Sequence, residues 1–298
     1  MISADDLRFF LEVSRTTRLG EAARRLNVDQ TTVSRRIVKL EKDLGQRLFD
    51  RTPIGWLVTE AGRRLITHAE AIEATLIVAL EDADASINGQ LTGSLRVLAP
   101  DGFGSFVLIP GLHKFAASHP NLSIEVATAT THDLLTGRDF DVGITLERPS
   151  PRSVLTHRLA RYELRLYASR NYLSSHGVPA TLDDLHQHRM IWYIDAFLDV
   201  EPLQITDTLL PGVRIGLQAN NIAGHLQAAQ HGLGIAPLPT FIGGSDDRLV
   251  EVLSHSFVAS RQYWLVIPRD LARLARVKEF VIALREIISA NHHLIELS

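Results

Sequence analysis

The sequence contains no cysteine among its 298 residues. Disulfide bonds and metal sites built from thiolates are therefore excluded, and nothing argues for an oxidising compartment. No apolar run reaches the roughly 18 residues that a membrane-spanning helix needs. The first six residues, MISADD, are acidic where a secretion signal would be basic. These absences predict a cytoplasmic protein that has no membrane partner.

Motifs for catalysis and cofactor binding are also missing. There is no Gly-x4-Gly-Lys-Ser/Thr phosphate loop and no Gly-x-Ser-x-Gly nucleophile turn. Gly232-Leu-Gly234 lacks the third glycine of a dinucleotide-binding loop and precedes a predicted strand instead of following one. His186 with His188, and His292 with His293, are isolated pairs without a third ligand, so solvated polar positions are the better interpretation. We therefore expect no enzyme, no cofactor and no resident metal ion.

Composition and charge indicate a globular protein with one basic end. At 45% hydrophobic and 22% charged residues, the chain is balanced like a soluble protein of two or three domains. A net charge of −3 argues against a general nucleic-acid coat protein. Residues 1–64, however, hold 13 lysines and arginines against 9 acidic residues. This imbalance is small enough to arise by chance, but it would concentrate attraction for phosphates at the N-terminal end.

Residues 20–43 predict two short helices joined by a tight turn. Apolar residues recur at helical spacing on both sides of a break at Asn27–Asp29. Asp29 is placed to cap the second helix, since its carboxylate can accept the free backbone N–H groups of the first turn. The two apolar faces consist of Ala22, Ala23 and Leu26, and of Val33, Ile37 and Leu40.

The second of these helices presents polar side chains suited to DNA. Gln can pair with an adenine edge, Arg can fork onto guanine, Thr can meet a thymine methyl, and Ser or Lys can hold phosphates. Such a helix, braced by a preceding Ala-Ala helix, is typical of the recognition half of a helix-turn-helix. An ordinary polar helix face is the alternative. The predicted DNA-binding residues are Gln30, Thr31, Thr32, Ser34, Arg35, Arg36, Lys39 and Arg51.

Further local elements surround this pair of helices. A first helix is predicted at residues 4–15, and Leu44-Gly45 ends the recognition helix. Residues 51–59 form a predicted hairpin, which would be a wing with Arg51 as a phosphate contact at its start. Thr59 is the predicted N-cap of a long helix that follows.

That long helix, from residue 60 to about residue 88, would extend about 43 Å. Its apolar positions alternate steps of four and three residues, which is a heptad seam typical of a coiled coil with a second copy. An amphipathic helix lying on its own domain is the alternative. A dimer would present two recognition helices to half-sites about one turn of DNA apart. The predicted dimerisation residues are Leu65, Ala69, Ile72, Leu76, Ala79 and Ala83.

After a Gly-containing hinge at residues 88–93, strands alternate with helices. This alternation predicts an open, largely parallel sheet, arranged as two α/β lobes joined by crossing strands with a ligand cleft between them. Strands are predicted at residues 94–99, 123–127, 140–145, 165–168, 190–193, 214–217, 234–238 and 263–267. Helices are predicted at residues 110–118, 132–136, 221–231 and 271–290.

At this point the sequence resembles the LysR-type transcriptional regulators over essentially the whole chain. The N-terminal match comprises Leu7, Phe10, Ala22-Ala23, Leu26, Val28, Gln30, Val33-Ser34, Ile37, Leu40-Glu41, Leu44-Gly45, Leu48-Phe49, Arg51, Thr59 and Gly62. The later match comprises Gly93-x-Leu-Arg-Val, Pro110, His119-Pro120, Asp141-Val-Gly-Ile, residues 232–239 and Trp264-Leu-Val. Two departures are Thr17-Arg18, where the family usually has Gly-Ser, and Asp29, where it often has a Ser cap.

The resemblance implies an α+β multidomain protein. Residues 1–59 would form a winged helix-turn-helix, residues 60–90 a dimerising linker helix, and residues 91–298 a periplasmic-binding-protein-like effector domain, commonly assembled into tetramers. Lobe I would comprise residues 91–162 and 264–298, and lobe II residues 163–263. A small-molecule effector is expected between the lobes.

Polar residues in the loops after the predicted strands are the candidates for binding that effector. A helix N-terminus after residue 100 would suit an anionic group, but the Asp101 carboxylate would repel an anion and could instead pair with a cation or cap the helix. For each candidate the alternative is a cap or turn residue. The predicted effector-binding residues are Asp101, Gly102, Phe103, Ser105, Thr128, Thr130, Thr131, Trp192, Asn220 and Asn221.

The sequence therefore predicts a regulator that binds promoter DNA as a homodimer or homotetramer and responds to an effector. RNA polymerase is a candidate further partner. The alternative from another class is a metabolite-binding or enzymatic α/β protein with a dimerising helical N-terminus. Salt-dependent DNA binding separates the two, because phosphate contacts impose a steep loss of affinity with salt.

Overall fold

The computed structural model describes residues 2–88, 91–128, 140–149, 154–194, 210–291 and 295–297. These residues form two compact units, Met1–Gln90 and Leu91–Ser298. No helix among the described residues is both long and apolar enough to cross a membrane.

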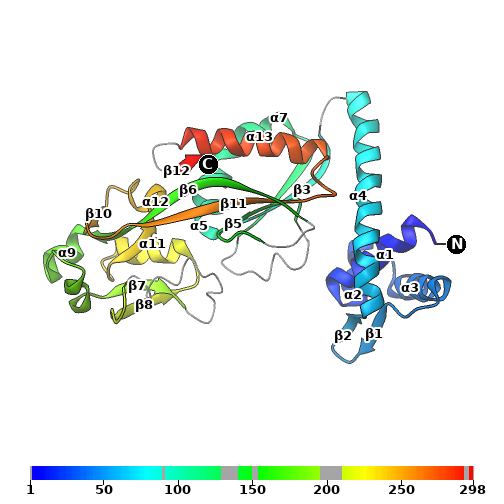
Figure 1. The fold of residues 1–298 in the computed structure, drawn as a ribbon, viewed down its shortest axis with the longest axis horizontal. Helices are drawn as coiled ribbons and strands as arrows, with labels where there is room; N and C mark the ends of the chain where they lie inside the picture. The colour runs from blue at the N-terminus through cyan, green and yellow to red at the C-terminus, as the bar shows by residue number, and fades with distance from the viewer. Residues whose placement is uncertain are drawn as a thin grey trace. The chain divides into compact units, whose positions relative to one another are not determined.

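The first unit contains four helices and a hairpin (Figure 1). Its elements are α1 (Ala4–Thr16), α2 (Leu19–Leu26), α3 (Gln30–Leu44), β1 (Phe49–Thr52), β2 (Gly55–Val58) and α4 (Glu60–Asn88). The antiparallel pairing of β1 with β2 makes the hairpin. The predicted helix pair, hairpin and long helix are all confirmed.

The predicted ends of these helices are confirmed as well. The Asp29 carboxylate accepts a hydrogen bond of 2.8 Å from the backbone N–H of Thr32 and so caps α3. Gly45 ends α3 with a φ of 67°, a left-handed conformation that glycine adopts without steric cost. The Thr59 hydroxyl accepts from the N–H of Gly62 at 3.1 Å and caps α4.

Apolar residues of all these elements meet in one core. Phe10 of α1, Ile37 of α3 and Phe49 of β1 are buried in it. The rings of Phe10 and Phe49 lie 5.4 Å apart, and Trp56 extends the aromatic contact from Phe49 at 5.7 Å. Burial of each large apolar side chain stabilises the fold by about 1.5–3 kcal/mol. The core therefore fixes α3 and the hairpin relative to each other.

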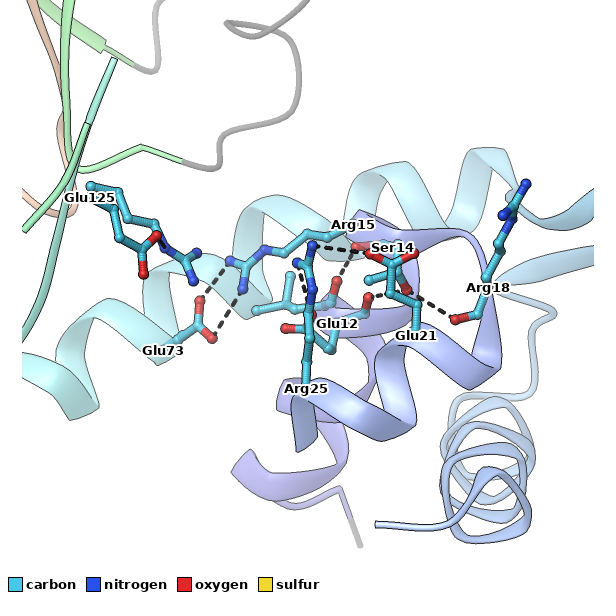
Figure 2. Close-up of polar contacts among 11 residues, drawn as sticks. Glu12, Ser14, Arg15, Arg18, Glu21, Arg25, Glu73 and Glu125 are labelled. Atoms are coloured by element: carbon cyan, nitrogen blue, oxygen red, sulfur yellow. Dashed lines mark hydrogen bonds and ion pairs between the residues drawn. The ribbon is translucent and has the colours of Figure 1, made fainter. Parts of the chain in front are cut away.

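The first turns of α4 belong to this same core. Ala69 is fully buried there and Leu65 packs against it, so these two members of the predicted seam serve their own domain in this chain. An ion pair of 2.8 Å between Arg15 of α1 and Glu73 adds to the attachment (Figure 2). Further along α4, Ile72 and Leu76 are 41% and 48% exposed.

The second unit is built on strands of one large sheet and one small sheet (Figure 1). The large sheet contains β3 (Gly93–Ala99), β4 (Leu122–Thr128), β5 (Val142–Thr145), β6 (Val154–Ser169), β9 (Ala236–Pro239), β10 (Leu249–Val252), β11 (Ala259–Pro268) and β12 (Ile295–Leu297). The small sheet contains β7 (Met190–Tyr193) and β8 (Ile215–Ala219).

The strand order in the large sheet is β10-β6-β11-β5-β3-β4, with β9 and β12 also pairing with β6. β3 is parallel to β4 and β5, but β6 is antiparallel to β9, β10, β11 and β12. The prediction of a largely parallel sheet is therefore wrong for the large sheet. Helix-strand alternation predicts parallel neighbours, whereas the long strands β6 and β11 pair with each other in opposite directions.

Helices cover these sheets. They are α5 (Asp101–Phe103), a π-helical turn η1 (Gly104–Leu108), α6 (Ile109–Gly111), α7 (His113–Ser118), α9 (Arg170–His176), a 3-10 helix η2 (Asp183–Gln187), α11 (Ile222–Gln230), α12 (Thr240–Gly243) and α13 (Ala275–Ala290). The last helix begins four residues later than predicted. α7 and α13 lie together, with the rings of Phe115 and Phe280 5.7 Å apart (Figure 1). The predicted helix at residues 132–136 lies outside the described residues.

Candidate DNA-binding surface and effector site

The start of α3 is organised by the Asp29 carboxylate. It accepts hydrogen bonds from the hydroxyls of both Thr31 and Thr32, in addition to the backbone bond from Thr32. These bonds hold the pKa of Asp29 far below its usual range, so the group is ionised at neutral pH. The two threonine hydroxyls predicted to face DNA are thus already engaged as donors. Their methyl groups and remaining lone pairs are what they can offer to a base edge.

Gln30, at the first position of α3, is exposed beside α2. A Cβ atom on Gly20 would lie 2.5 Å from its Nε2, so the absence of a side chain at position 20 makes room for the glutamine amide. Arg35 is exposed, and Ser34 is half-buried. Among the described residues, no ion pair involves Arg35.

Arg36 and Lys39 differ from Arg35, because both are tied to α1. Arg36 forms ion pairs with Asp6 at 2.9 Å and with Asp5 at 3.0 Å, and the Lys39 ammonium lies 3.0 Å from Asp6. The Asp6 side chain is fully buried. Burial alone would raise its pKa, but the hydrogen bonds from Arg36 and Lys39 outweigh this and lower the pKa to about 2. These two cations therefore neutralise a buried carboxylate, and about half of the Lys39 side chain stays exposed.

In the hairpin, Arg51 is also directed back toward the protein. Its guanidinium lies 4.5 Å from the centroid of the Trp56 ring and 3.6 Å from a carboxylate oxygen of Glu41. Glu41 is itself fixed by the backbone N–H groups of Leu48 and Phe49. Arg51 keeps 51% of its side chain exposed, so it can still meet a phosphate from this position.

Sequence reasoning did not identify Asp6 or Gly20 as partners of the DNA-facing residues. Asp6 is 30 residues from Arg36 in the chain, and it could be found only as an acidic residue in the first turn of α1. Gly20 was part of the predicted helix pair, but no sequence signal connects it with Gln30.

In the second unit, Asp101 links distant elements. Its carboxylate accepts a hydrogen bond of 2.6 Å from the backbone N–H of Ile222, at the start of α11, and one of 3.5 Å from the Tyr193 hydroxyl. Burial raises the pKa of Asp101, although these bonds oppose that effect. Among the described residues that line the small cavity beside Asp101, there is no lysine, arginine or histidine.

A cavity of about 20 Å³, room for roughly one water molecule, adjoins Asp101. Trp192 is one of the lining residues, and its indole Nε1 is buried and has no hydrogen-bond partner within the described part of the chain. An unpaired buried donor is costly, so a ligand acceptor placed here would gain a full hydrogen bond. The cavity is lined by Pro100, Asp101, Gly102, Leu146, Tyr162, Leu164, Trp192, Tyr193, Ile222, Pro237, Pro239 and Tyr263.

The aromatic and histidine side chains around the cavity carry no charge at neutral pH. The stacked rings of Tyr162 and Tyr263 lie 4.4 Å apart, and burial raises the pKa of both phenols. His225 contacts Trp192 and Tyr193, and burial lowers its pKa to about 4, which leaves it neutral at pH 7. Among the described residues that line the cavity, Asp101 is therefore the one with an acidic side chain.

The remaining predicted effector residues are distributed unevenly. Gly102 lines the cavity, and Phe103 is buried with its ring 4.8 Å from Tyr263. Asn221 caps α11 by accepting from the N–H of Gly224 and donates to Asn220. Neither Phe103 nor Asn221 is among the residues that line the cavity, and the same holds for the exposed Ser105, Thr128 and Asn220. Thr130 and Thr131 lie outside the described residues.

The histidine pairs do not gather a metal site in the described structure. His186 contacts the Gly212 carbonyl at 3.1 Å, and His188 contacts the Tyr172 hydroxyl at 3.2 Å. No group of three or more potential ligands lies together among the described residues. His292 and His293 lie outside them.

Comparison with known proteins decides what kind of protein carries these features. A family model described as "Bacterial regulatory helix-turn-helix protein, lysR family" matches residues 4–63, and one described as "LysR substrate binding domain" matches residues 88–288. The chain belongs to the LysR family. It is a DNA-binding transcriptional regulator with an N-terminal helix-turn-helix and an effector-binding domain.

Individual LysR relatives and structures agree with this assignment. An HTH-type transcriptional regulator of Haemophilus influenzae is 30% identical over 255 residues, which cover 83% of this chain and 87% of the relative. Full-length OxyR C199D of Pseudomonas aeruginosa has a TM-score of 0.72 at 20% identity, covering 96% of this chain and 95% of that chain. Full-length CbnR complexed with its target DNA has a TM-score of 0.57 at 18% identity, covering 96% and 100%. Both structures share the fold.

Proposed function

We propose that α3 reads the operator in the major groove chiefly through Gln30 and Arg35. The proposal rests on a difference between the polar residues of α3. Arg36 and Lys39 form ion pairs with Asp6, whereas Arg35 and Gln30 are exposed. A bidentate Arg–guanine or Gln–adenine pair contributes about 1–3 kcal/mol of discrimination. Arg36 and Lys39 would add positive charge near the phosphates while they hold α3 on α1.

The contacts of Ser34, Thr31, Thr32 and Arg51 follow from their positions. Ser34 and the outward part of Arg51 would hold phosphates, which fix the register of the protein on DNA. Thr31 and Thr32 would present methyl groups to thymine, since their hydroxyl protons are used by Asp29.

Dimerisation would use the exposed part of α4. Ile72 and Leu76, with Ala79, continue the heptad spacing beyond the domain core and are uncovered in the single chain. Ala83 extends the same seam. Such a seam favours a dimer with two recognition helices, and a dimer of dimers would give the tetramer. RNA polymerase would be the next partner once the regulator is on its promoter.

The effector would bind beside Asp101, between lobe I (residues 91–162 and 264–298) and lobe II (residues 163–263), in an arrangement of the lobes that enlarges the present cavity of about 20 Å³. The Trp192 Nε1 donor and the Asp101 carboxylate would orient it. In the present arrangement Asp101 joins the lobes through Ile222 and Tyr193. An effector that binds one arrangement of the lobes better than the other shifts the population between them, and equal affinity for both would shift nothing.

Base reading by Gln30 and Arg35 is tested with a duplex enriched from a random library by the wild-type protein. Gln30→Ala and Arg35→Ala should each reduce discrimination between this duplex and random DNA by about 1–3 kcal/mol. Arg285→Ala, an exposed arginine in the other unit, is the matched control. Equal loss of affinity for both DNAs would show that the two side chains hold only phosphate.

A further inference from the structure

The tip of the hairpin carries an unusually exposed apolar side chain. Ile54 is 77% exposed, more than any other large hydrophobic residue that the structure describes. It follows Pro53 in the turn between β1 and β2, and the four turn residues Thr52 to Gly55 contain no charge. A single exposed isoleucine is ordinary on a protein surface. Its significance here depends on how the tip is held and on what lies beside it.

The tip is held firmly. The Thr52 hydroxyl donates to the Gly55 carbonyl at 2.8 Å and closes the turn. The N–H of Trp56 donates to the Thr17 carbonyl at 2.8 Å, which anchors the hairpin to the turn between α1 and α2. Gly55 has a φ of 147°, and a Cβ atom there would lie 2.7 Å from the Thr17 carbonyl oxygen. The hairpin thus approaches this turn closely, and Pro53 further restricts the tip backbone.

The anchor of the hairpin is also close in the chain to the residue that contacts the start of α3. Thr17 contacts the hairpin, and Gly20, three residues later, makes room for Gln30 of α3. The short segment 17–20 therefore separates Gly55 and Trp56, next to the hairpin tip, from the first residue of α3. If α3 occupies a major groove, the hairpin tip lies beside the flanking DNA.

The positively charged side chain of the hairpin, that of Arg51, makes its contacts away from the tip. Arg51 lies over the Trp56 ring and pairs with Glu41. The tip therefore offers the DNA a rigid, neutral and apolar surface. Apolar side chains, isoleucine and proline among them, are used in minor grooves as wedges between base steps.

We propose that Ile54, backed by Pro53, enters the minor groove next to the α3 site as an apolar wedge. The inference rests on the proposed function of α3 as the reading helix. The wedge contributes to affinity by burying apolar surface and releases no counterions, so its share of binding is independent of salt. It also favours flanking steps that open easily, which adds sequence preference at positions that α3 does not reach.

The experiment uses the full chain and the enriched duplex, with 2-aminopurine placed at the steps that flank the α3 site. Ile54→Ser should weaken binding about tenfold, since burial of an isoleucine is worth at least about 1.5 kcal/mol. The slope of log affinity against log salt should stay unchanged, and the rise in 2-aminopurine fluorescence on binding should disappear. Val178→Ser, which removes another exposed apolar side chain (69% exposed) in the other unit, is the control and should change nothing.

A second variant distinguishes a wedge from a surface that merely touches phosphate. Ile54→Arg should steepen the salt slope by about 0.9 for each contact to a phosphate. Inosine in place of guanine at the flanking steps removes the minor-groove amino group and should strengthen binding of the wild type but not of Ile54→Ser.

Binding of Ile54→Ser within twofold of the wild type, or an unchanged 2-aminopurine signal, would overturn the wedge. Equal effects of inosine on both proteins would overturn its placement in the minor groove. Failure of the proposed function would look different, because the wild-type protein would then enrich no duplex from the library at all.

Discussion

The Asp101 carboxylate accepts a hydrogen bond of 2.6 Å from the backbone N–H of Ile222, 121 residues away in the chain. A carboxylate from the first residue of α5 therefore occupies the N-terminus of α11, where an anion is stabilised by unpaired N–H groups and the helix dipole. An anionic effector would have to displace this side chain to use the same N–H group.

Loss of this link should expose the buried Trp192. In a background with Trp56→Phe and Trp264→Phe, Trp192 is the only indole, and acrylamide quenching reports its accessibility. Asp101→Ala should increase quenching severalfold, because neither Ile222 nor Tyr193 keeps its partner. Asp101→Asn keeps an acceptor and should change quenching less. Identical quenching in all three proteins would show that Asp101 does not hold these elements together.

The pairing of Asp6 with α3 predicts a dependence of stability on acid. The pKa of Asp6 is about 2 in the folded state, below the value of 3.8 in the unfolded state. The contribution of Asp6 to the free energy of unfolding is therefore complete above about pH 4 and is lost as pH falls toward 2. The contribution should be about 1–2 kcal/mol, reduced from the full shift because Arg36 and Lys39 are partly solvated.

The contribution of Asp6 to the free energy of unfolding is measured by urea unfolding of the first unit. Trp56 fluorescence follows the unfolding in a Trp192→Phe, Trp264→Phe background. Asp6→Asn should lower stability at pH 7 and flatten the fall between pH 4 and pH 2. The exposed Asp50→Asn is the control. A variant with the same acid profile as the wild type would contradict the role of Asp6.

The contact between Gly20 and Gln30 predicts that stability and specificity can be changed in opposite directions. Gly20→Ala should stabilise α2 by up to about 1 kcal/mol, because alanine is the better helix former. The new Cβ atom would displace the Gln30 amide, which lies 2.5 Å from it. Discrimination against random DNA should fall as it does in Gln30→Ala, and the double variant should be no worse than either single one. Unchanged discrimination would place the Gln30 amide elsewhere in the DNA complex.

The exposed stretch of α4 predicts a charge-sensitive dimer. Leu76→Glu should shift sedimentation from the oligomer toward the monomer, because two carboxylates would face each other across the seam. Glu60→Gln, on the exposed start of the same helix, should leave the oligomer intact. Leu76→Glu that sediments like the wild type would remove this stretch from the interface.

Local signals account for what the sequence predicted well. Asp29, Gly45 and Thr59 each fix a helix end through a bond to a neighbour three or four residues away, so their roles can be inferred without tertiary structure. The same holds for the hairpin and for most strands of the second unit, but β10 and β12 were not predicted and β6 was predicted only at residues 165–168.

Tertiary contacts account for what the sequence did not predict. Leu65 and Ala69 follow the same apolar heptad spacing as Ile72 and Leu76, so the sequence does not distinguish the two pairs. The fold, however, packs only Leu65 and Ala69 against α1 and the domain core. The bonds from Asp6 to α3 and from Asp101 to Ile222 join residues 30 and 121 positions apart. The antiparallel course of β6 and β11 likewise depends on pairing over long distances, which helix-strand alternation does not report.

The most direct test of the account is a titration of the purified full-length protein against the DNA upstream of its own gene, with random DNA as competitor, at two salt concentrations. We predict selective binding that weakens steeply with salt, with the selectivity lost in Arg35→Ala and kept in Arg285→Ala. Binding that does not discriminate against random DNA, by an intact oligomer and with effector candidates present, would contradict base reading by α3.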